Sequence, residues 1–212
     1  MRRTMAAIAM LAFAGPAAAQ HAGHGTGGGL PDGWHGRVDR ESQQLADVRF
    51  MTMGSTFHVI TGPHVILWKP EHSGTGAYTA SATFRQAKAP ERPEGFGLFV
   101  GGQDLGGAGQ DYLYFLIRHD GSYMIRHRAG SEVHTLADWT AHDAVRRPTA
   151  SEGASNTVAI DAGATRVRFL VNDVEVRAFD RVPMLNTDGI AGFRIGHHLD
   201  VHIADFVVSP AQ

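Results

Sequence analysis

The 212-residue sequence contains no cysteine, little excess charge of either sign and only one long hydrophobic run, at its N-terminus. Without thiols the chain forms no disulfides, so packing alone must hold its fold. The formal net charge of −2 provides no basic surface for nucleic acid. Beyond residue 19 no apolar stretch is long enough to cross a membrane. We therefore expect no nucleic-acid partner and no membrane insertion of the mature chain.

The N-terminal hydrophobic run has the pattern of a secretory signal. Arg2 and Arg3 precede the short apolar segment MAAIAMLAFAG, and an A-x-A pattern follows at Ala17 and Ala19. We predict a signal peptide over residues 1–19 that is cleaved before Gln20, which leaves a formal net charge of about −4. The expected location is periplasmic or secreted.

The rest of the chain divides into a tail and one domain. Residues 20–33, QHAGHGTGGGLPDG, are rich in glycine and histidine and have no periodicity, which predicts a flexible tail. Residues 34–212 are enough for a single hydrophobic core. At the start of this domain, RVDRESQQLADVRFM (37–51) predicts a short helix or an irregular wrap.

Sustained helical periodicity is missing after residue 51. Short β-branched and aromatic segments alternate with turn residues, for example YTASATFRQ (78–86), EGFGLFVGG (94–102) and NTVAIDA (156–162). About eleven such segments with hairpin links and no crossover helices predict an all-β fold, an antiparallel β-sandwich of the jelly-roll type.

Two turns set the expected strand registers. A three-residue loop, His119-Asp120-Gly121 with Gly121 in the left-handed region, would place Phe115 opposite Ile125 in an apolar face. Asn172 and Asp173 both tolerate positive φ and predict a two-residue turn between directly paired strands.

The segment VGGQDLGGAGQDY (100–112) raises the question of a phosphate site. A phosphate-binding loop requires a strand before the glycines and a helix after them. Here the glycines precede DYLYFLIR (111–118), a strand pattern, and no Gly-Lys-Ser/Thr follows. The segment is therefore interpreted as a wide connection between strands that lines a binding surface.

The predicted register places polar and aromatic side chains together on one sheet face beside this loop. Flat rings suit sugar stacking, and guanidinium groups suit hydroxyls or carboxylates. The candidate ligand-binding residues are Tyr112, Tyr114, Arg126 and Arg128 on the strands, with Gln103 and Asp104 in the loop.

The sequence carries thirteen histidines, which raises a metal hypothesis because neutral imidazole binds zinc and copper. His197, His198 and His202 lie close in sequence, and His198 with His202 is the candidate pair for a divalent metal. Solvent-exposed turn histidines are the alternative interpretation. No HExxH spacing and no Gly-x-Ser-x-Gly elbow occurs, so no other cofactor and no catalytic residues are assigned.

Three stretches together resemble a known family: GFGLFVGG with the hairpin that follows it, VNDVEV at 171–176, and GIAGFRIG paired with the apolar last strand. Over roughly residues 55–209 the chain resembles the concanavalin A-like lectin/glucanase superfamily. Within it, the chain is similar to the 3-keto-disaccharide-hydrolase-like domains of exported bacterial proteins. The resemblance implies a β-sandwich and a glycan or glycoside partner.

Three functions are compatible with this resemblance. One is an exported domain that binds a glycan on a sheet face. Another is a hydrolase or lyase acting on a modified, 3-keto-type disaccharide with metal assistance. The third is a cell-envelope interaction domain without a small ligand. Ordinary retaining glucanase activity is not expected, because the strand with paired carboxylates that the glucanases use is missing.

Overall fold

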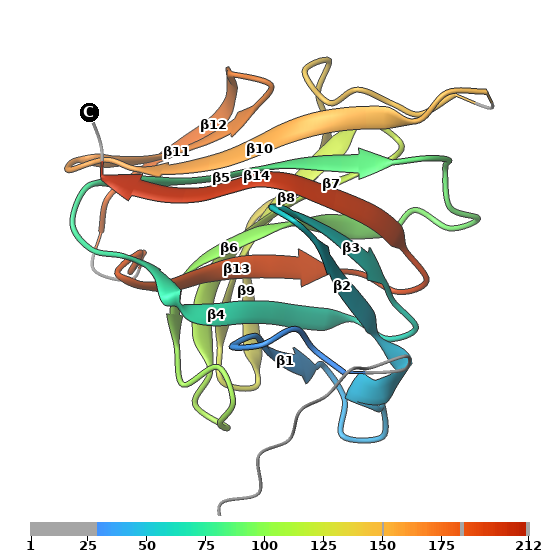
Figure 1. Ribbon diagram of the computed structural model, residues 1–212. Helices are drawn as coiled ribbons and strands as arrows, with labels where there is room; N and C mark the ends of the chain where they lie inside the picture. The colour runs from blue at the N-terminus through green and yellow to red at the C-terminus, as the bar shows by residue number, and fades with distance from the viewer. Residues whose placement is uncertain (1–28, 150, 183–184, 211–212) are drawn as a thin grey trace, which may run out of the picture.

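The computed structural model describes residues 29–149, 151–182 and 185–210, so the predicted signal peptide and most of the predicted tail lie outside the described residues. The described chain forms two antiparallel seven-stranded sheets that lie face to face (Figure 1). This confirms the predicted antiparallel β-sandwich. None of the helices in these residues has the length and apolar character needed to span a membrane.

The first sheet has the strand order β1-β4-β13-β6-β7-β8-β9. Its strands, in that order, are β1 (His35–Val38), β4 (Val65–Gly74), β13 (Gly189–Ile195), β6 (Gly95–Gln103), β7 (Asp111–Arg118), β8 (Ser122–Ala129) and β9 (Glu132–Ala141).

The second sheet has the strand order β12-β11-β10-β5-β14-β3-β2. Its strands are β12 (Val174–Asp180), β11 (Arg166–Val171), β10 (Ala154–Ala162), β5 (Tyr78–Gln86), β14 (Asp200–Pro210), β3 (Thr56–Ile60) and β2 (Arg49–Met53). The last strand of the chain, β14, lies between the early strands β5 and β3 of this sheet.

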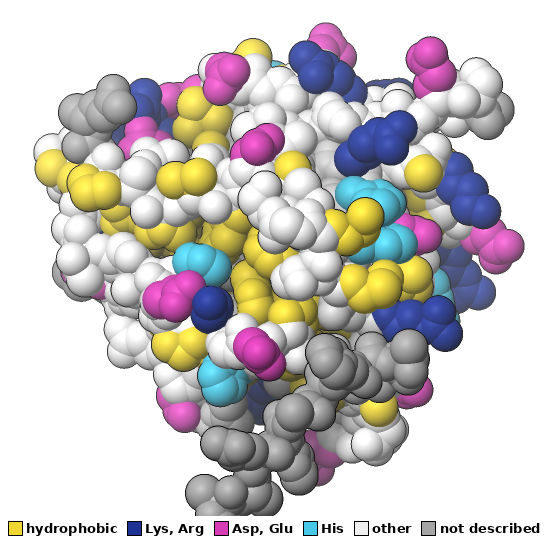
Figure 2. Space-filling model, in the orientation of Figure 1, with side chains coloured by type: hydrophobic (Ala, Val, Ile, Leu, Met, Phe, Trp, Pro, Cys, Tyr) yellow, Lys and Arg dark blue, Asp and Glu magenta, His cyan; other side chains and the backbone are white. Residues whose placement is uncertain are grey.

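Alternation of buried and accessible residues builds the core between the sheets. In β5, Ala80, Ala82 and Phe84 are buried, and the residues between them face away from the core. On the first sheet Phe193 is fully buried and its ring stacks on Trp34, with 5.4 Å between ring centroids. Figure 2 shows hydrophobic side chains along the line where the two sheets meet, so the core reaches the surface on this side.

The central hairpin has the register predicted from its turn. Phe115 pairs with Ile125 and Ile117 pairs with Tyr123. Gly121 has φ 86° and allows the three-residue connection. The physical reason is burial, since this register places Phe115 and Ile125, both fully buried, on the core face.

The Asn172-Asp173 turn is also confirmed. The two residues have φ 51° and 65°, and Val171 pairs with Val174 across the turn. Asn172 does more than tolerate this conformation. Its side-chain NH₂ donates hydrogen bonds to Ala144 O at 2.7 Å and Asn156 Oδ1 at 2.9 Å, which anchors the turn to a neighbouring loop.

The N-terminal part of the domain agrees with the sequence-based expectation in one segment and differs in another. Residues 37–51, predicted as a short helix or an irregular wrap, hold the short 3-10 helix η1 (Leu45–Asp47) between parts of two strands. Leu30, placed in the predicted tail, is half-buried and packs against the core. Ordered structure therefore begins before Trp34, because an apolar side chain at position 30 finds a buried surface.

Candidate functional site

A pocket of about 540 Å³ lies at the rim of the sandwich, where the glycine-rich β6–β7 loop meets the β8–β9 hairpin. We call it the rim pocket. It is lined by Gln103, Asp104, Gly109, Asp111, His127, His134 and Asn186. Gln103 and Asp104, which the sequence predicted as ligand-binding residues, therefore do line a pocket. Four further polar side chains, which the sequence analysis did not group with them, also line it: Asp111, His127, His134 and Asn186.

The glycines of the loop allow the chain to wrap around the Asp104 carboxylate. Asp104 has φ 45°, and its Oδ2 accepts a hydrogen bond from the Gly109 N–H at 2.9 Å. A Cβ at position 107 would lie 2.1 Å from Asp104 Oδ1, so a larger residue there would displace the Asp104 carboxylate from its present position. Arg37 donates hydrogen bonds to the carbonyl oxygens of Leu105 and Gly107 and holds the loop from outside. The loop is a carboxylate-centred turn and not a phosphate cradle.

The floor of the rim pocket is a carboxylate–histidine pair. His127 Nε2 lies 3.1 Å from Asp111 Oδ1. His134 is directly opposite His127 on β9, and the two rings stack with 5.9 Å between centroids. Sequence reasoning missed this grouping because it did not fix the register of the β8–β9 hairpin. The two-residue Gly130-Ser131 connection was the available signal, since Gly130 adopts φ 59° and closes the turn between Ala129 and Glu132.

The rim pocket presents both hydrogen-bond donors and acceptors, without an arginine or lysine among its lining residues. Carboxylates accept, and amides and neutral imidazoles both donate and accept. Each hydroxyl of a sugar also donates and accepts, so this set matches a polyhydroxylated neutral ligand better than a phosphate.

The four strand residues predicted for the site lie on the outer face of the first sheet. Tyr112 and Tyr114 are 1% and 3% exposed. Their rings pack in a second apolar cluster with Phe99 and Leu105, which also contains Ile66, Trp68, Leu116 and Met124. The expectation that these rings offer open stacking surfaces is therefore wrong. The cause is that the large side chains of this cluster lie beside each other on the outer face and cover one another.

The two arginines remain accessible. Arg126 lies opposite Tyr114 and its Nη2 is 3.7 Å from Asp138 Oδ1, with a third of the side chain exposed. Arg128 donates from Nε to the Gly130 carbonyl oxygen at 2.7 Å. Trp139 on β9 is half-buried against the apolar cluster, and Arg118 lies over its ring at 4.2 Å. The accessible part of this face is lined by these arginines and Trp139. It lies on the other face of the sheet from His127, because His127 and Arg126 are adjacent on β8 and point to opposite sides.

A second pocket, of about 750 Å³, lies at the opposite end of the first sheet and contains His198. Its lining residues are Arg40, Pro90, Glu91, Arg92, Glu94, His197 and His198. His198 sits in a turn with φ 50°, whereas His202 lies on β14 with His58 and Asp200. The structure thus places the predicted metal pair in two different groups. The left-handed turn at His198 separates its side chain from the strand that follows.

His64 lies beside this second pocket in contact with His197. The two ring centroids are 3.8 Å apart, and His64 Nε2 is 3.9 Å from Glu94 Oε2. Burial, followed by the positive charge of Arg194 and the neighbouring His197, lowers the pKa of His64 to about 4. His64 is therefore neutral at pH 7 and titrates only under acidic conditions.

This shift predicts a pH dependence of stability. Between pH 6.5 and about 4 the unfolded chain binds a proton at His64 that the folded chain does not. The free energy of unfolding therefore falls as the pH drops through this window. With 34% of the His64 side chain exposed, we expect a loss of about 1–2 kcal/mol rather than the full linkage value.

Denaturant unfolding at pH 7 and pH 4.5 measures this loss for the parent, for His64→Gln and for His35→Gln, which replaces an exposed histidine of β1. His64→Gln should show a smaller loss than the parent, and His35→Gln the same loss. Burial also lowers the pKa of His72, so part of the loss remains in every variant. An equal loss in His64→Gln and the parent would contradict the assignment.

Comparison with known proteins identifies the fold. No protein-family model matches the chain, and no curated protein matches it in sequence. Among solved structures, the carbohydrate-binding module CBM66 from Bacillus subtilis is similar, with a TM-score of 0.59 and 8% identity over 84% of this chain and 95% of that chain.

Two further solved structures are similar. The metal-free carbohydrate recognition domain of Emp46p has a TM-score of 0.53 and 14% identity over 82% of this chain and 89% of that chain. Alginate lyase A1-II′, as a double-cysteine variant, has a TM-score of 0.52 and 10% identity over 76% and 83% of the two chains. These likenesses confirm the concanavalin A-like jelly-roll fold. The narrower resemblance to 3-keto-disaccharide-hydrolase-like domains stays a prediction.

Proposed function

We propose that the chain is an exported carbohydrate-interacting domain that binds a glycan or glycoside in the rim pocket. The main observation behind this proposal is that six polar side chains line one open pocket: Gln103, Asp104, Asp111, His127, His134 and Asn186. Two of the similar structures are, by name, a carbohydrate-binding module and a carbohydrate recognition domain, which supports a sugar as the ligand.

A glycan array probed with the chain lacking residues 1–19 tests this proposal, followed by calorimetric titration of each ligand found. Asp111→Asn should weaken binding about tenfold or more, because a hydrogen bond to a charged group contributes about 1.5–3 kcal/mol. Gln103→Ala should weaken binding by a smaller factor, because a neutral hydrogen bond contributes about 0.5–1.5 kcal/mol. Asp180→Asn replaces an exposed carboxylate on β12 and should bind as the parent does.

Arg126→Ala separates the rim pocket from the outer face. This variant should bind each glycan as the parent does, because Arg126 is not among the lining residues of the rim pocket and points to the other face of the sheet from His127. If Arg126→Ala abolishes binding and the Gln103 and Asp111 variants bind normally, the site lies on the outer face instead. If no glycan binds, the alternative of an envelope domain without a small ligand is favoured.

An enzyme is the second candidate because of the Asp111–His127 pair. A carboxylate 3.1 Å from an imidazole orients it as a general base or acid. A similar solved structure is by name an alginate lyase, which shows that the fold accommodates such chemistry. Incubation with each bound glycan distinguishes the two functions. A new reducing end or the ultraviolet absorbance of an unsaturated product, lost in His127→Gln, would assign an enzyme.

A further inference from the structure

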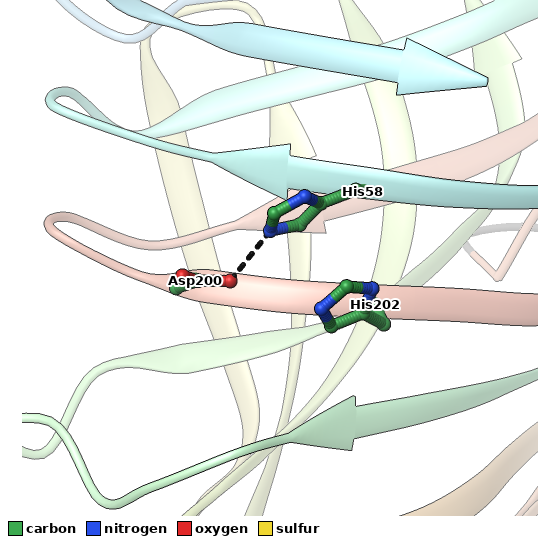
Figure 3. A group of neighbouring side chains, drawn as sticks. All are labelled: His58, Asp200 and His202. Atoms are coloured by element: carbon green, nitrogen blue, oxygen red, sulfur yellow. Dashed lines mark hydrogen bonds and ion pairs between the residues drawn. The ribbon is translucent and has the colours of Figure 1, made fainter. Parts of the chain in front are cut away.

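Three side chains with metal-binding groups come together on the outer face of the second sheet. His58 lies on β3, and Asp200 and His202 lie on the neighbouring strand β14. His58 and His202 are directly opposite each other in the strand register. Val59 and Val201 point into the core and are fully buried, so the three polar side chains face outward. Figure 3 shows the two rings facing each other, with Asp200 beside His58.

The distances between these groups are close to those of a metal site. His58 Nε2 is 2.7 Å from Asp200 Oδ1, and the rings of His58 and His202 stack with 4.1 Å between centroids. One ligand atom from each residue lies within 4.8 Å of the other two. Ligands of a tetrahedral zinc ion are about 3.4 Å apart, given metal–ligand distances of about 2.0–2.2 Å. Small side-chain rotations are enough to converge the three atoms.

The donor set decides which ion fits. Two imidazole nitrogens and one carboxylate oxygen are typical ligands of Zn²⁺ and Cu²⁺, whereas Ca²⁺ and Mg²⁺ require oxygen ligands almost throughout. We propose that His58, His202 and Asp200 bind a divalent transition-metal ion, Zn²⁺ or Cu²⁺, with the remaining coordination positions open to solvent. Asp200 is 60% exposed, so an ion reaches the site from the surface.

The neighbours of the site are compatible with a bound cation. Met51 on β2 lies opposite His58, and its thioether, on a side chain 43% exposed, can approach a copper ion. Arg85 on β5 lies opposite His202, and Arg49 on β2 is in the row of Asp200. Both arginines are exposed and their long side chains can turn into solvent.

The site is independent of the proposed glycan pocket, which lies on the first sheet. It differs from the sequence-based pair by taking His58 in place of His198. An experiment must therefore distinguish His58 from His198 as the partner of His202, because His198 and other surface histidines also offer imidazole to added metal. His21 and His24, which lie outside the described residues, do the same.

Equilibrium dialysis of the chain lacking residues 1–19 against Zn²⁺, and separately against Cu²⁺, followed by metal analysis, tests the proposal. The parent should bind one ion per chain, with micromolar or tighter affinity, that the variants do not bind. These variants are His58→Gln, His202→Gln and Asp200→Asn. His198→Gln is the matched control and should bind as the parent does. An excess of Ca²⁺ over the transition metal should not displace the bound ion.

Thermal unfolding with and without metal is the second readout. Binding to the folded chain should raise the Tm of the parent by about 3 °C or more at saturating metal, and that of His58→Gln by clearly less. Asp200→Asn changes an exposed side chain and keeps a folded comparison available if a histidine variant does not fold. The proposal is overturned if the three variants bind as much metal as the parent, if only His198→Gln loses the ion, or if Ca²⁺ displaces it.

Discussion

Replacement of Arg194 by methionine should lower the free energy of unfolding by about 3–5 kcal/mol, because it removes one partner of a buried ion pair. Arg194 is 8% exposed and binds the Asp39 carboxylate with both terminal nitrogens, at 3.0 and 2.6 Å. It also donates to the Tyr112 hydroxyl at 2.9 Å. The variant leaves a half-buried carboxylate and a buried hydroxyl without this donor.

Arg166→Met is the matched control for this variant. Arg166 is 54% exposed and 4.0 Å from Asp180, so the change should stay within about 0.5 kcal/mol. The double variant Arg194→Met/Asp39→Leu should recover part of the loss, because no unpaired charge remains. Denaturant unfolding measures all three. Equal stability of Arg194→Met and the parent would show that solvent replaces the arginine.

The same ion pair sets a limit on acid stability. Burial of Asp39 opposes its ionisation, but the charge and hydrogen bonds of Arg194 outweigh burial and lower the pKa of the carboxyl group. The stabilisation is present above the ordinary aspartate pKa and is lost as the pH falls below it. This loss occurs at lower pH than the loss predicted for His64, so the two effects are separable.

Phe193→Ala should also lower the free energy of unfolding by about 3–5 kcal/mol, through loss of a buried aromatic ring and formation of a cavity. The Phe193 ring is fully buried on β13, the strand between β4 and β6. It contacts four aromatic side chains, with centroid distances of 4.6 to 6.1 Å: Trp34, Phe57, Phe84 and Phe206. Removal of this ring affects both sheets.

Two comparisons make this prediction specific. Phe193→Leu keeps part of the volume and should lose clearly less stability than Phe193→Ala. Val207→Ala on β14 changes a side chain that is 48% exposed and should have an effect within about 0.5 kcal/mol. A loss below about 1 kcal/mol in Phe193→Ala would mean that the aromatic cluster closes around the missing ring.

The sequence was sufficient for the architecture and for two local registers. Alternating apolar residues in segments such as 78–86 and the absence of helical periodicity predict strands buried on one face. The positive-φ residues Gly121 and Asn172 then determine how neighbouring strands pair. These features are local, because a turn type and a two-residue period act over a few positions.

Only the tertiary structure decided which polar side chains share a site. His58 and His202 are far apart in the chain, and Asp104, His134 and Asn186 come from three different connections or strands; strand order alone brings them together. It also decided that Tyr112 and Tyr114 are buried, because exposure depends on how neighbouring strands cover each other rather than on the face a residue occupies. Sequence pattern determines the face of a side chain, and long-range packing determines its neighbours and its access to solvent.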